Sequence, residues 1–224
     1  MLHMPTPMLL NNQSSAPRGQ RAFASLFGTF SFVVLADVTL ISVVGVARGA
    51  SSSYDGLDLG SPTRGGRGGG LAYSNNIPVS PGETLTVAFS NHTELRRGGT
   101  VLLRATNDMS EQIGQVSFHG GAGSTSVLGG QAVSGGGAAG YEAPGGDGVP
   151  GVQVGGGGAS LLGGIGGGNN GGGAALKPTG SAGDAYGGGG SSNNNANGGV
   201  VGSGGLRIIW GDGRAFPNTL TGDV

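Results

Sequence analysis

Apolar and polar residues alternate in several short stretches of the chain, which is the pattern of half-buried β-strands. The clearest is TLTVAF at residues 84–89, where large apolar residues occupy every second position. A turn precedes it at residues 80–83, where Pro81 presets φ and Gly82 permits a positive φ. Further short strands are predicted at residues 100–106, 115–119 and 206–210, and no stretch has an amphipathic helical period.

A long apolar run, FSFVVLADVTLISVVGVA, occupies residues 30–47. Its phenylalanine, valine, threonine and isoleucine suit a pleated surface, so it predicts a β-hairpin with strands at 29–35 and 38–46. The turn falls at Ala36 and Asp37. A signal-peptide core or a membrane span is the alternative, but Asp37 lies in the middle of the run, which barely reaches the length of a span.

These six strands, separated by turn signals, predict an all-β protein. We expect a small β-sandwich or barrel-like domain with a glycine-rich excursion before its last strand. The chain divides into an extended N-terminal docking arm at residues 1–22, a β-strand framework at 23–119, a glycine-rich region at 120–205, and a last strand with a C-terminal tail at 206–224 that packs on the framework.

The N-terminal arm has three prolines and no sustained period, so no regular element is predicted there. Its apolar residues suit burial against a neighbouring molecule, and the candidates for docking on a larger particle are Met4, Met8, Leu9 and Leu10. A disordered terminus is the alternative interpretation.

Glycine dominates one block of the chain. Of 224 residues 54 are glycine, and 36 of these lie among the 86 residues from 120 to 205. Apolar residues punctuate the block, which a solvated linker would not need. An ordered or partly ordered bundle of polyglycine-II-like helices, with three residues per turn, is therefore favoured over a disordered loop. Collagen is excluded because the strict triplet period fails.

Charge and composition argue against nucleic-acid binding, metal binding and catalysis. The net charge is -1 and only 10% of residues are charged, so no basic surplus exists for a nucleic acid. There is no cysteine, and the three histidines lack metal-ligand spacing. Residues 64–70, RGGRGGG, resemble a short RNA-binding box, but a glycine loop is the favoured interpretation. Arg96, Arg97 and Arg104 near Glu94 indicate a solvated strand face or an intersubunit patch. We expect no enzyme activity, cofactor or metal.

Three segments resemble a known family. FGTFSFVVLADVTLISVVGVARGAS (27–51), GGGLAYSNNIPVSPGETLTV (68–87) and GGLRIIWGDGRAFPNTLTGDV (204–224) are similar to motifs of glycine-rich structural proteins of bacteriophages, above all marine and cyanobacterial phages. The last segment is the most specific. The residues that carry the resemblance are Tyr73, Asn76, Pro81, Gly82, Arg207, Trp210, Gly211, Arg214, Phe216 and Pro217.

The resemblance implies a non-enzymatic virion structural protein, a tail fibre or receptor-binding appendage at the virion surface, made in the infected bacterial cytoplasm. Its expected partners are other virion proteins, further copies of itself in a trimer, and a host-cell surface receptor, with no nucleic acid and no membrane span. A head decoration protein is the alternative within this class. A secreted glycine-rich cell-wall or matrix protein and an RNA-binding protein are alternatives from other classes.

Overall fold

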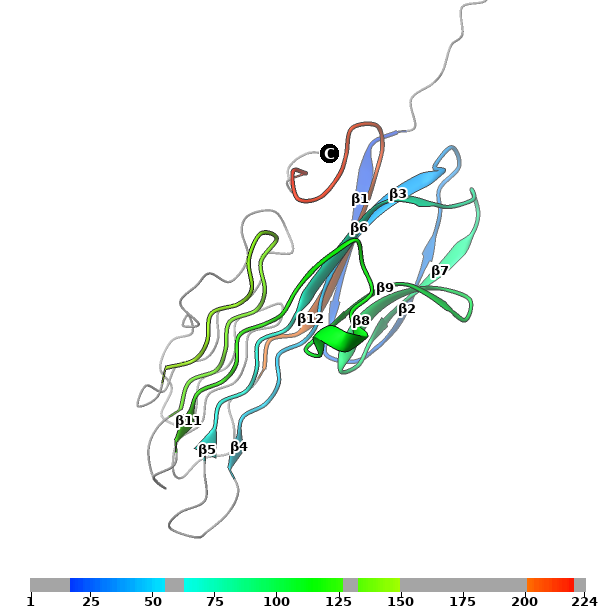
Figure 1. Cartoon of the computed structure of the whole chain (residues 1–224). Helices are drawn as coiled ribbons and strands as arrows, with labels where there is room; N and C mark the ends of the chain where they lie inside the picture. The colour runs from blue at the N-terminus through cyan, green and yellow to red at the C-terminus, as the bar shows by residue number, and fades with distance from the viewer. Residues whose placement is uncertain (1–16, 55–62, 127–132, 150–200, 220–224) are drawn as a thin grey trace, which may run out of the picture.

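The computed structural model describes residues 17–54, 63–126, 133–149 and 201–219. These residues form antiparallel strands and one short 3-10 helix, η1 (Met109–Glu111), and no α-helix occurs among them. Two sheets pack face to face as a sandwich, and a bundle of glycine-rich segments extends from one end of it (Figure 1). The predicted all-β class is confirmed.

The larger sheet has five strands in the order β1-β12-β3-β6-β10. Its second strand comes from the far end of the chain, so residues near the two termini lie side by side at one edge. The strands are β1 (Gly19–Ser25), β12 (Gly204–Trp210), β3 (Leu40–Val46), β6 (Leu71–Pro78) and β10 (Val116–Phe118).

The smaller sheet has four strands in the order β2-β7-β8-β9. It is built from three successive hairpin neighbours plus β2, which arrives from the other sheet. The strands are β2 (Gly28–Val33), β7 (Thr84–Phe89), β8 (His92–Arg97) and β9 (Thr100–Thr106). The alternating pattern of residues 84–89 is explained, because every second side chain of β7 enters the core.

The predicted hairpin at residues 29–46 is wrong. Both strands exist, but β2 pairs with β7 in the smaller sheet whereas β3 pairs with β6 and β12 in the larger one. The intervening segment crosses between the sheets, where Val34 and Val38 are both buried in the shared core and Asp37 adopts a φ of 67°. Burial of both valines between the sheets is therefore more favourable than pairing β2 with β3.

The larger sheet is buried on both faces. One face shares a core with the smaller sheet, and the other face is covered by Ala138, Ala139, Tyr141 and Phe216. All seven residues of β12 and six of the seven in β3 are accordingly buried. Strands buried on both faces are expected to be continuously apolar, which explains the LISVVGV sequence of β3.

The larger sheet continues beyond its own ends into glycine-rich segments. We call residues 47–50, 65–70, 119–124, 134–139, 145–148 and 201–203 the glycine array. Its segments run side by side from the sandwich to a small sheet of β11 (Thr125–Ser126), β5 (Thr63–Arg64) and β4 (Ser53–Tyr54) (Figure 1).

Backbone hydrogen bonds within the array recur every third residue. In the segment that leads into β6, the amides of Gly68 and Gly65 donate to the carbonyls of Gly121 and Ser124, at 2.9 and 2.8 Å. Both bonds keep the register in which Leu71 of β6 faces Phe118 of β10. A period of three with bonds to neighbouring segments is the arrangement expected of polyglycine-II-like packing.

Three array segments form a closed cycle of donors and acceptors. Residues 65 and 68 donate to the second segment, and the amides of Gly121 and Ser124 there donate to carbonyls of the third, at 2.8 and 3.0 Å. The third segment returns to the first, because the amides of Gly136 and Ala139 donate to Gly66 and Gly69, both at 2.9 Å. Each segment thereby satisfies backbone groups that burial would otherwise leave without partners.

Only glycine fits where these backbones meet. A Cβ added to Gly68 would lie 1.9 Å from the carbonyl oxygen of Gly137, and one added to Gly120 would lie 2.0 Å from that of Gly68. These contacts are with backbone rather than with flexible side-chain ends, so a larger residue forces the segments apart. The RGGRGGG loop is thus part of the array.

Several predicted features lie partly or wholly outside the described residues. Strand β1 begins at Gly19, within the predicted arm of residues 1–22, and residues 1–16 are outside the described ranges. Residues 127–132 and 150–200 of the predicted glycine-rich region are also outside them.

Replacing Gly68 by alanine is expected to lower the free energy of unfolding by about 1–3 kcal/mol, because the added methyl group overpacks a backbone contact. Calorimetric unfolding measures the loss. Gly99→Ala is the matched control, since nothing lies within 4 Å of its added Cβ. Equal stability of the two variants would contradict the close packing of the array.

Candidate functional site

Most residues that carry the family resemblance meet around the C-terminal tail. Tyr73 of β6 lies under the tail with Phe216 and with Tyr141 from the end of the array. The rings of Tyr141 and Phe216 stack with centroids 5.9 Å apart, and Tyr73 lies 6.4 Å from Phe216. Burial raises the pKa of Tyr141 to about 12, while the Arg207 guanidinium acts in the opposite direction.

Arg207 projects from β12 into this aromatic cluster and is fully buried. Its Nε donates to Oε1 of Gln20 at 2.9 Å, and its Nη1 donates to the carbonyl of Thr219 at 3.1 Å. The guanidinium also lies over the Phe216 ring, 5.6 Å from the centroid. One cation therefore links β12, β1 and the C-terminal tail.

The remaining residues of the last motif shape the loop that returns over the sheet. Gly211 has a φ of 105°, a conformation that favours glycine. Arg214 is buried and donates to the carbonyl of Gly19. Trp210 packs against Phe32, with ring centroids 5.7 Å apart. The peptide bond before Pro217 is cis.

Asn75, which sequence analysis did not single out, holds the tail directly. Its Nδ2 donates to the carbonyl of Phe216 and its Oδ1 accepts from the Phe216 amide, both at 2.9 Å. The neighbouring Asn76 is exposed, with a φ of 56° that bends the strand. The only signal in the sequence that could have pointed to Asn75 is its place beside Asn76, a residue of the resembling motif.

Pro81 and Gly82 form the predicted turn at one end of the smaller sheet. Gly82 has a φ of 78°, and its amide donates to the carbonyl of Val34 at 2.9 Å. The Glu83 carboxylate pairs with Arg97, and this hydrogen bond is the largest cause that lowers the pKa of Glu83. The turn is therefore structural. The docking candidates Met4, Met8, Leu9 and Leu10 lie outside the described residues.

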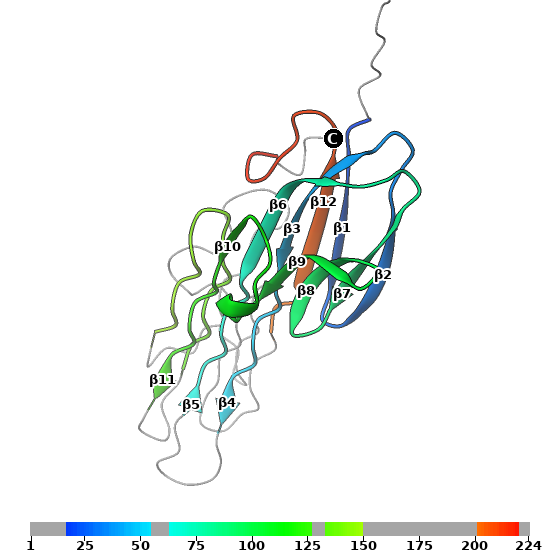
Figure 2. The same ribbon diagram turned by 45° about the vertical axis from the view of Figure 1, so that its right-hand side comes forward.

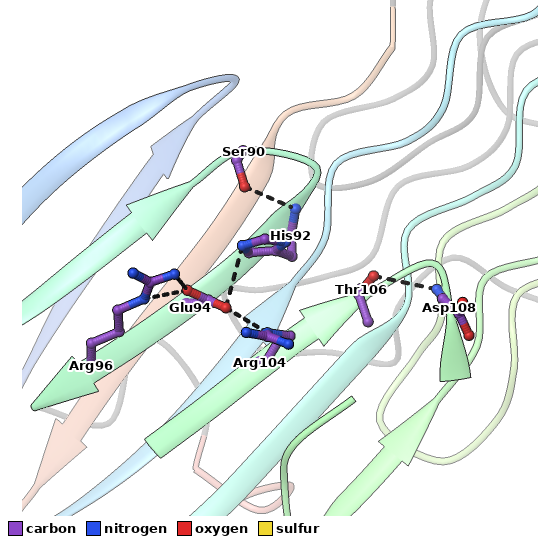
Figure 3. A network of polar contacts seen from close by, with 7 residues as sticks. All are labelled: Ser90, His92, Glu94, Arg96, Arg104, Thr106 and Asp108. Atoms are coloured by element: carbon purple, nitrogen blue, oxygen red, sulfur yellow. Dashed lines mark hydrogen bonds and ion pairs between the residues drawn. The ribbon is translucent and has the colours of Figure 1, made fainter. Parts of the chain in front are cut away.

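Glu94 is buried on the outer face of the smaller sheet. Its side chain is covered by His92, Arg96 and Arg104 (Figure 3), with His92 Nε2 3.3 Å from Glu94 Oε1. Side chains of Arg96 and Arg104 are 40% and 25% exposed, whereas that of Glu94 is fully covered. The expected solvated strand face is therefore a compact ion cluster with a covered carboxylate.

A polar groove of about 380 Å³ lies where the sandwich meets the glycine array. Arg67 comes from the array, Asn107 and Asp108 follow β9, His119 follows β10, and Asp147 comes from the array segment 145–148. This is within the size range of small-ligand sites. We take this groove as the candidate functional site.

Local hydrogen bonds fix the walls of the groove. Asn107 accepts from the Gly70 amide at 3.2 Å, and Asp147 accepts from the Ala122 amide at 2.7 Å. Asp108 caps η1 by accepting from the amide and hydroxyl of Ser110, and these bonds lower the pKa of its carboxyl group. Both sides of the groove are thus preorganised.

The groove offers hydrogen-bond donors and acceptors. The guanidinium of Arg67 donates, the carboxylates of Asp108 and Asp147 accept, and the exposed Met109 adds apolar surface. Within the described ranges, no group of three or more histidine or acidic residues is placed to hold a metal ion. Such a lining suits recognition of a hydroxyl-rich ligand such as a glycan.

Sequence comparison adds no relative to this picture. No family model matches the chain, and no curated protein gives a significant match to it. In the part of the chain that the structure describes, no helix is both long and apolar enough to cross a membrane.

Replacing Glu94 by glutamine is expected to cost about 1–3 kcal/mol of stability, because the surrounding cations lose their counter-charge while solvent still screens the two arginines. Urea unfolding followed by Trp210 fluorescence measures it. The exposed Glu111→Gln is the control, and a Glu94→Gln protein as stable as wild type would refute the importance of the cluster.

Replacing Arg207 by methionine keeps the apolar length but leaves Gln20 and the Thr219 carbonyl without this donor. We expect a loss of about 2–4 kcal/mol, since unsatisfied buried acceptors are costly. The same unfolding assay applies, with the exposed Arg64→Met as control. A loss no larger than that of the control would show that Arg207 does not hold the tail.

Proposed function

We propose that this chain is a non-enzymatic bacteriophage virion protein, a tail fibre or receptor-binding appendage at the virion surface. The observation that carries the proposal is that residues of the last resembling segment have structural roles in the fold. Arg207, Trp210, Arg214 and Phe216 are all buried. Arg207, Arg214 and Phe216 hold the tail against the sheet, and Trp210 packs in the core between the sheets. A resemblance carried by residues that build the fold supports membership of that structural class. A resemblance confined to scattered surface positions would support it less.

The glycine array supports a projecting role. It extends one sheet of the sandwich away from the core through backbone hydrogen bonds, without a large apolar interior of its own. Such a body projects from the sandwich, which carries the apolar packing. The polar groove beside the array is the proposed contact for hydroxyl-rich groups of a host-cell surface.

The proposed partners are other virion proteins, further copies of this chain in a trimer, and a host-surface receptor. The apolar residues Met4, Met8, Leu9 and Leu10 are the proposed anchor to the particle. A net charge of -1 supports the proposal that no nucleic acid is bound. No enzymatic step is proposed.

The test is whether the chain is built into purified particles of the phage that encodes it. We expect it to co-sediment with intact particles at a fixed copy number and to be found on the tail by electron microscopy of a labelled copy. Regular copies over the head shell would instead assign it as a decoration protein. Complete absence from purified particles would overturn the virion proposal.

A variant separates anchoring from folding. Leu9→Asp is expected to reduce incorporation into particles while leaving the unfolding temperature unchanged. Val149→Asp, at an exposed apolar residue of the glycine-rich region, is the control and is expected to incorporate normally. Normal incorporation of Leu9→Asp would remove the N-terminal anchor from the proposal.

A further inference from the structure

The sandwich is open along one side, where its two sheets end in β1 and β2. Within the described ranges each is an edge strand, and the two follow one another in the chain through Leu26 and Phe27. They lie next to each other across the gap between the sheets (Figure 2), since the rings of Phe23 on β1 and Phe30 on β2 have centroids 5.9 Å apart. We call this the β1–β2 side.

Apolar surface is concentrated on this side. Phe27 is 60% exposed, Val33 is 55% exposed, and Leu26, Phe30 and Leu35 are exposed as well. Five of the six residues of β2 are exposed, which is unusual for a strand of sequence GTFSFV. Several large apolar side chains exposed along one side of a soluble protein point to an interaction site.

The edge of β2 has none of the usual protections. No charged residue occurs between Arg21 and Asp37, and β2 contains no proline. Its register with β7 shows no bulge, and its outer edge pairs with no described strand. Exposed strand edges ordinarily carry a charge, a proline, a bulge or a cover, because a bare edge pairs with other chains.

The opposite edge of the same sheet, at β9, is protected. At β9, the amide of Arg104 donates to the Ile113 carbonyl at 2.9 Å, and the Ile113 amide donates back at 3.0 Å. The bridge covers that edge with the loop after η1, and Arg104 adds a charge. Among the described residues, the fold therefore covers one edge of this sheet and leaves the other bare.

Charges flank the bare edge with opposite signs. Arg18 and Arg21 are exposed on the β1 margin, and Asp37 is exposed beyond the end of β2. Arg18 and Asp37 lie at the same end of the sandwich, because Arg18 lies beside Gly211 after β12 and Asp37 precedes β3, which pairs with β12. In a ring whose axis follows the strands, the cationic margin of one copy faces the acidic margin of the next.

We propose that the β1–β2 side is the contact surface between copies of this chain, with a second copy as its occupant. The apolar residues form the centre of the contact, and the two charged margins set its head-to-tail orientation. The proposal shares with the proposed function only the homo-oligomer, and it makes no use of a virion or a receptor.

The experiment measures the mass of the full-length purified protein by sedimentation velocity at several concentrations. We expect the wild type to be an oligomer. Val33→Lys and Thr29→Lys place a charge on the exposed edge strand, and each is expected to raise the dissociation constant at least about tenfold and shift the protein toward the monomer. Two variants are used so that a folding defect in one leaves the other decisive.

Ile113→Lys is the matched control, because it is an exposed apolar residue at the covered edge of the same sheet. It should keep the wild-type mass, and all variants should keep the wild-type unfolding temperature when compared as monomers. A monomeric wild type, or lysine variants that remain fully oligomeric, would overturn the proposal.

Deleting residues 1–16 tests the main competing occupant. Loss of these residues should leave the oligomer intact. If the wild type is a monomer and the deletion makes it associate, the edge is covered by the chain's own N-terminal residues and the proposal fails. These outcomes are separate from the particle test, because a monomeric protein can still be incorporated into virions.

Discussion

A single backbone register governs the molecule from the sandwich to its far end. The pairing of β3 with β6 sets Val46 opposite Leu71, and the same register reappears in the array, where the Ala50 amide donates to Arg67, and at the tip, where Ser53 pairs with Arg64. What changes is the interval between hydrogen bonds, which becomes three residues in the array. The sheet can lengthen in this way only where side chains are missing from the contact.

The need for covered backbone explains why the array does not consist of a single layer. A single layer of glycine segments would leave the amides that point out of the layer without a backbone partner. Residues 134–139 and 145–148 lie against the extended layer and exchange hydrogen bonds with it. The same stretch then supplies Ala138, Ala139 and Tyr141 to cover the second face of the five-stranded sheet. Glycine packing and the aromatic cluster around Phe216 are therefore parts of one arrangement.

Sequence alone predicted those strands whose side chains alternate or run continuously apolar. Residues 84–89, 100–106 and 206–210 were found as strands, and the all-β class follows from them. The burial of Glu94 was invisible, because cross-strand neighbours create it. Arg67, Asp108 and Asp147 of the groove come from distant segments whose spacing carries no motif.

The glycine array and the β2 edge differ in whether their backbone groups have partners within the described chain. This difference bears on the proposed contact between copies. In the array, buried amides are satisfied by neighbouring segments of the same chain. At β2, the strand edge and the side chains of Phe30 and Val33 are left to solvent within the described chain. An all-β protein that covers the β9 edge has the means to cover β2 as well. A bare, apolar and uncharged edge fits the proposed contact between copies of this chain, because a second copy would cover it.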